Sequence, residues 1–382
     1  MRKNLRAFFE QTFSCAPLFV ARAPGRIEFV GNHTDYNGGQ VLGAAINRHV
    51  WVALAPRRDG RRRLVSAAGG DVVTLPNGGE KKQRGEKSWA NYPLGVLVAL
   101  RAFGRRVPAG FDLAVMSDLP AGAGLSSSAA LEVASALVFL AAVGEWDVPP
   151  EAVAEIARHA ENNFVGVPCG LLDQAVSCLG RRGRLVLVDC AGPRFSTVPL
   201  PAGARFWIFN THAKHALVEG LYAARHRECR SAARALGGPL LAAVTPAILA
   251  ANRDKLSLLL FRRASHVVGE VARVNATITA LQVGNLATAG KWLSASHRSS
   301  KRLFENSTTE LDFLAARLAR TPHVFGARLT GGGFGGAVLA LASPKFSAAQ
   351  ARAVVAAYGN KFGTAPDVLR LRAAGGAALV RD

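Results

Sequence analysis

The stretch "DLPAGAGLSSSAALEVA", residues 118–134, places a glycine-rich loop between an apolar strand pattern and a strongly helical run. Backbone N–H groups in the first turn of a helix lack partners within the helix and carry the positive end of its dipole. Gly122 and Gly124 let this backbone come close to an anion, so the pattern predicts a phosphate site. The three serines exceed what one helix cap requires, and a hydroxyl at such a place commonly holds Mg²⁺ beside phosphates. The P-loop pattern G-x-x-x-x-G-K-[ST] is absent.

The patterns on either side of this loop divide the chain of 382 residues into two unlike halves. Residues 20–75 alternate short apolar runs with Gly, Pro and Asn, which is typical of strands and hairpins. The second half is mostly helical and closes with a glycine loop, "TGGGFGG", between two apolar strands. This order predicts an α+β fold with a strand-rich N-terminal domain and a helix-rich C-terminal domain. Prolines cluster near residues 195–205, so we expect domains at residues 1–200 and 201–382.

Apolar spacing predicts a series of helices along the chain. One helix is expected to lead into the first strand, and others are expected at residues 89–104, 126–144, 149–166, 216–236, 264–283, 285–320 and 346–358. The helix at 126–144 is apolar on nearly all sides and should therefore be buried.

The net charge of +21, from 47 Lys and Arg against 26 Asp and Glu, raises the question of a nucleic-acid partner. The basic residues are scattered and no nucleic-acid-binding module accompanies them, so we prefer a basic solvated surface. Five sparse cysteines without a C-x-x-C pair predict reduced thiols and a cytoplasmic location rather than disulfides or zinc. No apolar run of about 18 residues occurs, so no membrane span is expected. We expect a monomer whose partners are small molecules.

Several stretches resemble the GHMP kinases, the superfamily that includes galactokinase, homoserine kinase and mevalonate kinase. "PAGAGLSSSAALEVA" resembles their phosphate-binding motif, and "GRIEFVGNHTDYNGGQVL", residues 25–42, is similar to the galactokinase signature. "LTGGGFGGAVLAL" resembles the third motif, and the resemblance also covers residues 160–180, 217–233 and 296–314. It implies a two-domain GHMP kinase-like fold with the active site between the domains. It also implies ATP-dependent phosphorylation of the anomeric hydroxyl of D-galactose to galactose 1-phosphate.

The same resemblance implies roles for particular residues. Asp173, in "CGLLDQ", is expected to be the general base, and Arg26, in "APGR", is expected to pair with it and to stabilise developing charge. Mg²⁺ is expected on Ser128 and Glu161. The expected ATP-binding residues are Gly122, Gly124, Leu125, Ser126, Ser127, Ser128 and Trp89, with Tyr92 beside Trp89. For the two aromatic residues, packing into the core is an equally good interpretation.

The sugar is expected to bind to residues of the first motif and of two later stretches. His33 and Asp35 are expected to bind sugar hydroxyls, and a carboxylate at Asp35 can accept from two neighbouring hydroxyls. Tyr222 is expected to lie against the sugar ring, and Gly170 is expected to let the backbone approach it. The glycines of residues 331–336 are expected to close the site beside the phosphate loop.

Asn32 departs from the galactokinase signature, because galactokinases have glutamate before the histidine, "GEHTDY". That glutamate accepts a hydrogen bond from the primary hydroxyl at C6 of the sugar. A neutral amide binds this hydroxyl more weakly, so two substrate classes stay open: galactose, or a galactose analogue altered at C6 such as galacturonate or L-arabinose. If galactose is the substrate, Asn32→Glu is expected to keep or improve activity. A non-catalytic sensor of galactose and ATP is a third alternative, which the intact phosphate loop and Asp173 disfavour.

Overall fold

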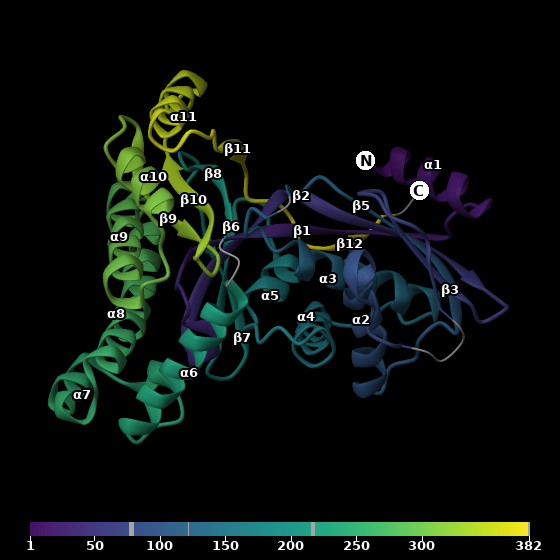
Figure 1. Cartoon of the computed structure of the whole chain (residues 1–382), viewed down its shortest axis with the longest axis horizontal. Helices are drawn as coiled ribbons and strands as arrows, with labels where there is room; N and C mark the ends of the chain where they lie inside the picture. The colour runs from purple at the N-terminus through teal and green to yellow at the C-terminus, as the bar shows by residue number, and fades with distance from the viewer. Residues whose placement is uncertain (76–79, 121, 215–217, 381–382) are drawn as a thin grey trace.

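The computed structural model describes residues 1–75, 80–120, 122–214 and 218–380 (Figure 1). Its helices are α1 (Arg2–Phe13), α2 (Asn91–Ala102), α3 (Ser127–Ala142), α4 (Pro150–His159), α5 (Leu172–Leu179), α6 (Val218–Ala235), α7 (Pro246–Ala251), α8 (Leu258–Gln282), α9 (Leu286–Ser299), α10 (Thr309–Ala319) and α11 (Ala348–Phe362). Its strands are β1 (Phe19–Val30), β2 (Gln40–Arg57), β3 (Arg62–Ser66), β4 (Val73–Leu75), β5 (Gly110–Ser117), β6 (Arg184–Asp189), β7 (Arg194–Pro199), β8 (Arg205–Lys214), β9 (Val324–Thr330), β10 (Gly335–Ala342), β11 (Asp367–Leu371) and β12 (Ala378–Leu379). Two π-helical turns, Ala160–Val165 and Ser300–Phe304, continue α4 and α9.

The first sheet has the strand order β12-β1-β2-β5-β3-β4, and β6 pairs with β2 and carries β7. The long strands β1 and β2 pair antiparallel, with Ile27 opposite Ala44, whereas β3 and β5 pair in parallel. Successive strand residues face opposite sides of a sheet, so each face of this sheet presents its own set of apolar side chains. A different helix covers each face. Helix α3 packs on β1 and β2 on one face, and α1 packs with Val20, Ala53 and Ala114 on the other.

The second sheet has the order β11-β8-β10-β9 with antiparallel pairs, and α9 and α10 cover it (Figure 1). The two sheets meet at the end of β1. The rings of Phe29 and Phe206 lie 5.9 Å apart there, and the backbone N–H of Glu28 donates to the Thr330 hydroxyl at 3.0 Å. The polar turn that follows β1 is thereby placed at the junction of the two sheets.

The α+β fold is confirmed, and so is the burial of the helix expected at 126–144. Twelve of the 16 residues of α3 are buried, because its sequence is apolar around most of its circumference. No helix in the described ranges is long and apolar enough to cross a bilayer.

Three features differ from the expected elements. The helix expected at 285–320 is interrupted, because Glu305 adopts a left-handed φ of 58° that ends the π-helical turn after α9. Thr308 then caps α10 by accepting from the N–H of Leu311. Helix α5 was not expected, and β12 is a two-residue strand that pairs with β1 without a signal in the sequence. Residues 216 and 217 of the helix expected at 216–236 lie outside the described residues.

The predicted boundary near residue 200 falls between the two sheets. Strands β1–β7 belong to the first sheet and β8–β11 to the second, whereas β12 returns from the C-terminal end of the chain to the first. The division into residues 1–200 and 201–382 therefore stays a prediction.

Candidate active site

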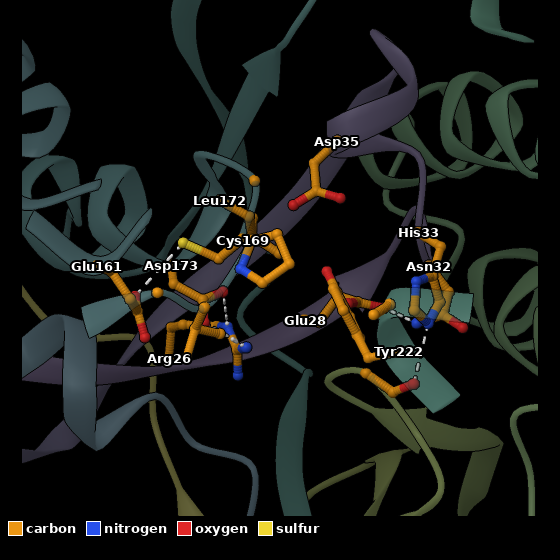
Figure 2. A pocket seen from close by; sticks show the side chains of 16 residues that line it. Arg26, Glu28, Asn32, His33, Asp35, Glu161, Cys169, Leu172, Asp173 and Tyr222 are labelled. Atoms are coloured by element: carbon orange, nitrogen blue, oxygen red, sulfur yellow. Dashed lines mark hydrogen bonds and ion pairs between the residues drawn. The ribbon is translucent and has the colours of Figure 1, made fainter. Parts of the chain in front are cut away.

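A cavity of about 390 Å³ lies between the end of β1, the loop before α5, helix α6 and the loop after β9 (Figure 2). It is lined by Arg26, Glu28, Asn32, His33, Asp35, Glu161, Gly166, Val167, Pro168, Cys169, Gly170, Leu172, Asp173, Tyr222, Ala223 and Gly332. All residues predicted for catalysis and sugar binding are among them, and so is Glu161. The residues predicted for ATP, by contrast, lie outside this lining.

Arg26 and Asp173 form a bidentate ion pair at one end of the cavity (Figure 2). Nε and Nη2 of Arg26 donate to the two carboxylate oxygens at 2.7 and 2.8 Å. Nη1 of the same guanidinium donates to the carbonyl of Gly124 at 2.6 Å, and the Arg26 N–H donates to the carbonyl of Leu125 at 3.0 Å. One side chain thus connects the predicted base with the glycine loop. The Asp173 side chain is 25% exposed, so it remains accessible from the cavity.

The start of α3 is arranged differently from an ordinary helix cap. Ser126 precedes the helix with a left-handed φ of 56°, and its hydroxyl donates to Asp173 Oδ2. Among the described residues no N-cap side chain bonds to the start of α3, so the N–H groups of its first turn, Ser127 and Ser128 included, lack the acceptor that a capping residue supplies. Such a helix start favours an anion. Ala121, in the same loop, lies outside the described residues.

The second glycine loop lies beside this helix start. A Cβ atom at Gly331 would be 3.2 Å from the carbonyl of Gly124, and one at Gly336 would be 4.0 Å from the carbonyl of Gly122. Gly331 and Gly336 therefore lie beside the predicted phosphate loop, and the closing of the site by residues 331–336 stays a prediction.

A buried carboxylate from α8 holds the turn after β1. Glu270 accepts from the N–H groups of Gly31 and Asn32 at 3.1 and 3.2 Å. Burial tends to raise the pKa of Glu270, but the Arg273 guanidinium and other cationic neighbours bring it down to about 2. Glu270 was missed in the sequence, although an acid on a buried helix face is a recognisable signal of a structural role.

His33 lines the cavity, but both of its ring nitrogens bond to the protein. Nε2 lies 2.9 Å from the carbonyl of Gly332, which can only accept, so Nε2 carries the proton. Nδ1 then accepts from the Tyr36 hydroxyl at 2.8 Å. Burial lowers the pKa of His33 to about 3, so the ring is neutral. In this arrangement no ring nitrogen is left for a sugar.

Asp35 projects its carboxylate into the cavity (Figure 2). Burial raises the pKa of Asp35 to about 7. A Cβ atom at position 170 would lie 1.8 Å from Asp35 Oδ2. Gly170 is therefore required to make room for this carboxylate, which is a different reason from the backbone approach to the sugar that the sequence indicated.

Tyr222 of α6 forms another wall of the cavity and lies against Gly332 and the ring of His33. Its hydroxyl has no hydrogen-bond partner among the described residues. Burial raises the pKa of Tyr222 well above its usual value, so the phenol stays protonated and can donate a hydrogen bond.

The Ser128 hydroxyl lies near enough to Glu161 to stabilise its carboxylate, which suits two ligands of one cation. Burial raises the pKa of Glu161 and the nearby Asp173 adds to the rise, so a bound cation would stabilise its ionised form. Gln174 orients the carboxylate by donating to Oε2 at 2.6 Å. Within the described ranges no cluster of three acidic, Cys or His side chains could hold a metal. One carboxylate and one hydroxyl still fit Mg²⁺, because this ion commonly completes its coordination with phosphate oxygens and water.

Asn32 is fully buried, and its amide is saturated with hydrogen bonds to the protein. Nδ2 donates to Glu28 Oε1 at 2.9 Å and to the carbonyl of Gly331 at 3.0 Å. Oδ1 accepts from Asn306 and Ser300 at 2.8 and 3.1 Å. Sugar binding by this amide, as predicted, would require one of these bonds to break.

Glu28 is a charged residue of the cavity lining that the sequence analysis overlooked. It lies two residues from Arg26 on β1, and therefore on the same face of the strand. A single carboxylate inside the apolar run of residues 27–30 was the available signal.

Trp89 and Tyr92 are half-buried and pack against the main hydrophobic core. This position is compatible with either interpretation of the two aromatics, so their adenine contact stays a prediction.

Comparison with known proteins places these features in a family. The galactokinase galactose-binding signature matches residues 7–56, and the GHMP kinase N-terminal and C-terminal domains match residues 91–181 and 277–361. Galactokinase from Roseiflexus sp. (strain RS-1) is 36% identical over 99% of this chain and 97% of its own length. Galactokinase from Homo sapiens is 38% identical over 88% of this chain and 86% of its own length.

Solved structures agree with the sequence comparisons. The crystal structure of Lactococcus lactis galactokinase complexed with galactose has a TM-score of 0.94 and 31% identity, covering 99% of each chain. A crystal structure of mevalonate kinase, at 16% identity and a TM-score of 0.65, shares the fold over 92% of this chain and 98% of its own. The GHMP kinase-like fold is therefore confirmed, and the chain belongs to the galactokinase family of the GHMP kinases.

Proposed function

We propose that this chain transfers the γ-phosphoryl group of ATP to the anomeric hydroxyl of D-galactose, giving galactose 1-phosphate and ADP. The observation that carries the proposal is the Arg26–Asp173 pair, which lies where the cavity meets the glycine loop before α3. Membership of the galactokinase family supports the same reaction. The relative from Lactococcus lactis was crystallised with galactose.

In this mechanism Asp173 accepts the proton of the anomeric hydroxyl. The sugar oxygen forms a bond to the γ-phosphorus while the bond from that phosphorus to the β–γ bridging oxygen breaks, and ADP leaves. Arg26 holds the Asp173 carboxylate toward the cavity through two hydrogen bonds. Its contact with Gly124 keeps the positive charge next to the loop, where it stabilises negative charge on the transferring group.

The nucleotide is assigned to the start of α3 and the loop before it. Gly122, Gly124, Leu125 and the N–H groups of the first helical turn would hold the phosphates. The Ser126 side chain is engaged with Asp173, so its contribution to ATP binding would come from the backbone. Ser128 and Glu161 would hold Mg²⁺, which when bound neutralises charge on the phosphates.

The sugar is assigned to the cavity at the end of β1. Asp35 offers a carboxylate and Tyr222 a phenol, and both line the cavity. In the described part of the chain neither forms an ion pair, and Asp35 accepts from the backbone N–H of Tyr36, which leaves acceptor capacity on its carboxylate. Galacturonate is not favoured, because its additional carboxylate would enter a cavity that Glu28, Asp35 and Asp173 already line.

We also propose a cytoplasmic monomer. All five cysteines are free, which suits a reducing compartment. Size-exclusion chromatography with light scattering should give a mass near the 40.2 kDa of one chain.

The test is a sugar panel with MgATP, read by coupled ADP release and by NMR of the product. We expect D-galactose to be used best and to carry the phosphate on its anomeric oxygen, with galacturonate and L-arabinose at least about tenfold poorer in kcat/KM. Activity with galacturonate about tenfold above galactose would replace the proposed substrate. Sugar binding without ADP release from any sugar would favour a sensor.

A further inference from the structure

We propose that the Glu28 carboxylate recognises the primary hydroxyl at C6 of the sugar, and that Asn32 is an amide because it must orient this carboxylate. The inference rests on the proposed function, since it assigns a specificity-determining contact within the same cavity. In this chain the acid that recognises C6 would thus be at position 28, four residues before position 32, where the galactokinase signature has its glutamate.

One oxygen of Glu28 is held by the protein and the other is not. Oε1 accepts from Asn32 Nδ2 at 2.9 Å and from Arg328 Nη2 at 2.8 Å. Oε2 has no hydrogen-bond partner among the described residues, and the side chain is 8% exposed toward the cavity that it lines. Figure 2 shows Glu28 between Arg26 and Asn32, behind the ring of Tyr222. A carboxylate fixed through one oxygen and open at the other is suited to accept from a ligand hydroxyl.

The neighbours of Asn32 fix the orientation of its amide. Glu28 and the Gly331 carbonyl can only accept, so the group that faces them must be the NH₂. The opposite side faces the amide NH₂ of Asn306, which donates to Oδ1. Asn32 therefore has no free donor or acceptor, and it acts on the sugar only through Glu28.

Arg328 favours the charged form of the Glu28 carboxylate, against the effect of burial. Its side chain is fully buried, and its Nη1 also donates to the carbonyls of Glu28 and Phe29 at 3.3 and 3.2 Å. Burial raises the pKa of Glu28, whereas Arg328 and Arg26 both act against that rise. The charged form makes the stronger hydrogen bond to a hydroxyl.

This arrangement reverses the expectation that Asn32→Glu keeps or improves activity with galactose. The new carboxylate would replace the NH₂ that lies 2.9 Å from Glu28 and 3.0 Å from the Gly331 carbonyl. Two carboxylates would then repel each other, and the Gly331 carbonyl would lose its donor. Position 32 can therefore carry an acid only if position 28 does not.

The first experiment compares galactose with 6-deoxygalactose in the wild-type protein by kcat/KM. A site that holds a polar group for a missing hydroxyl rejects the deoxy sugar strongly, so we expect galactose to be preferred by about tenfold to a hundredfold. Wild-type protein that uses both sugars within twofold overturns the inference and leaves the proposed galactokinase activity standing. No turnover of galactose would instead overturn the proposed function, and the inference with it.

The second experiment measures the same ratio in variants, because a ratio of two sugars does not depend on the fraction of folded protein. Glu28→Gln removes the charge, and Glu28→Asp keeps an acid beside Arg328 but withdraws its oxygens from the cavity. Both should bring the preference for galactose down by about tenfold. Asp112→Asn is the matched control, since Asp112 is a buried acid of β5 that pairs with Arg57 and Arg63 away from the cavity. Its ratio should equal that of wild type.

The third experiment exchanges the two residues. Asn32→Glu alone should lower kcat/KM for galactose by about tenfold or more, and Glu28→Asn combined with Asn32→Glu should recover at least part of that loss together with the preference over 6-deoxygalactose. The recovery is non-additive because one acid and one amide are again hydrogen-bonded. Additive losses in the double variant, or an unchanged ratio in both Glu28 variants, would show that Glu28 does not contact C6.

Discussion

Replacing Asp35 with asparagine should stabilise the folded protein at neutral and alkaline pH while it removes affinity for galactose. Burial raises the pKa of Asp35 to about 7, from a usual value of 3.8, and Glu28 and Asp173 add to the rise. At a pH between these two pKa values, Asp35 is protonated in the folded protein and ionised in the unfolded chain. Stability therefore falls as the pH rises through this window, and the cost is complete above about pH 7.

The size of the effect follows from the span of the window. Each pH unit corresponds to about 1.4 kcal/mol, so a span of about three units sets an upper limit of about 4 kcal/mol. Asp35 is only half-buried, and water in the cavity reduces this value. From pH 5 to pH 8, the free energy of unfolding of Asp35→Asn minus that of wild type should increase by about 1–2 kcal/mol.

Urea unfolding, followed by tryptophan fluorescence at several pH values without sugar, measures this difference. Asp59→Asn is the control, because pairing with Arg57 lowers the pKa of Asp59 to about 2, so its titration lies below this range. The control should show no change in its difference from wild type between pH 5 and pH 8. If the difference in unfolding free energy between Asp35→Asn and wild type also stayed constant from pH 5 to pH 8, Asp35 would not have a raised pKa. The electrostatic description of the cavity would then be wrong.

Three further substitutions test other parts of the site. Asp173→Asn should lower kcat by about a hundredfold to ten-thousandfold while calorimetric galactose binding stays within a few-fold of wild type; near wild-type kcat would remove Asp173 from the base role. Ser128→Ala should raise the Mg²⁺ concentration for half-maximal activity by about tenfold, and an unchanged metal titration would contradict its assignment as a ligand. Gly170→Ala should raise KM for galactose by about tenfold or more, because the new Cβ displaces the Asp35 carboxylate, and an unchanged KM would mean that Asp35 does not bind the sugar.

The sequence predicted residues whose chemistry is local to a motif. The glycine loop before α3 carries its own signal, because glycines, serines and a helical run stand next to one another. The Arg26–Asp173 pair joins residues 147 positions apart, and it was expected only because two motifs resemble those of one family. The burial of α3 followed from its composition, since a helix apolar on all sides cannot face water.

The residues that the sequence reasoning missed depend on distant partners. Glu28 finds Arg328 across 300 positions of the chain, and Glu270 finds the turn at Gly31 across 239. No local periodicity reports such a pairing, and a single acid in a strand has several possible explanations. Asn32 is an example, because the reason for an amide at this position is apparent only from its contact with the Glu28 carboxylate. A departure from a family motif at one position therefore has to be interpreted together with its neighbours in space.

The distribution of charge differs between the cavity assigned to the sugar and the helix start assigned to the nucleotide. Glu28, Asp35, Glu161 and Asp173 all line one cavity. Arg328 neutralises Glu28, and Arg26 neutralises Asp173. In the described ranges, by contrast, neither Asp35 nor Glu161 has a guanidinium or ammonium group within ion-pair distance. A neutral polyol satisfies such a cavity with its hydroxyl donors, whereas an anionic sugar would add to the repulsion.

In the proposed reaction the nucleotide would bind in a positive field, since the helix start beside the cavity favours anions and the chain as a whole carries a net charge of +21. The polyphosphate would lie on one side of Arg26 and the uncharged sugar on the other. The anomeric hydroxyl and the γ-phosphate would then meet at the guanidinium that contacts both Asp173 and Gly124.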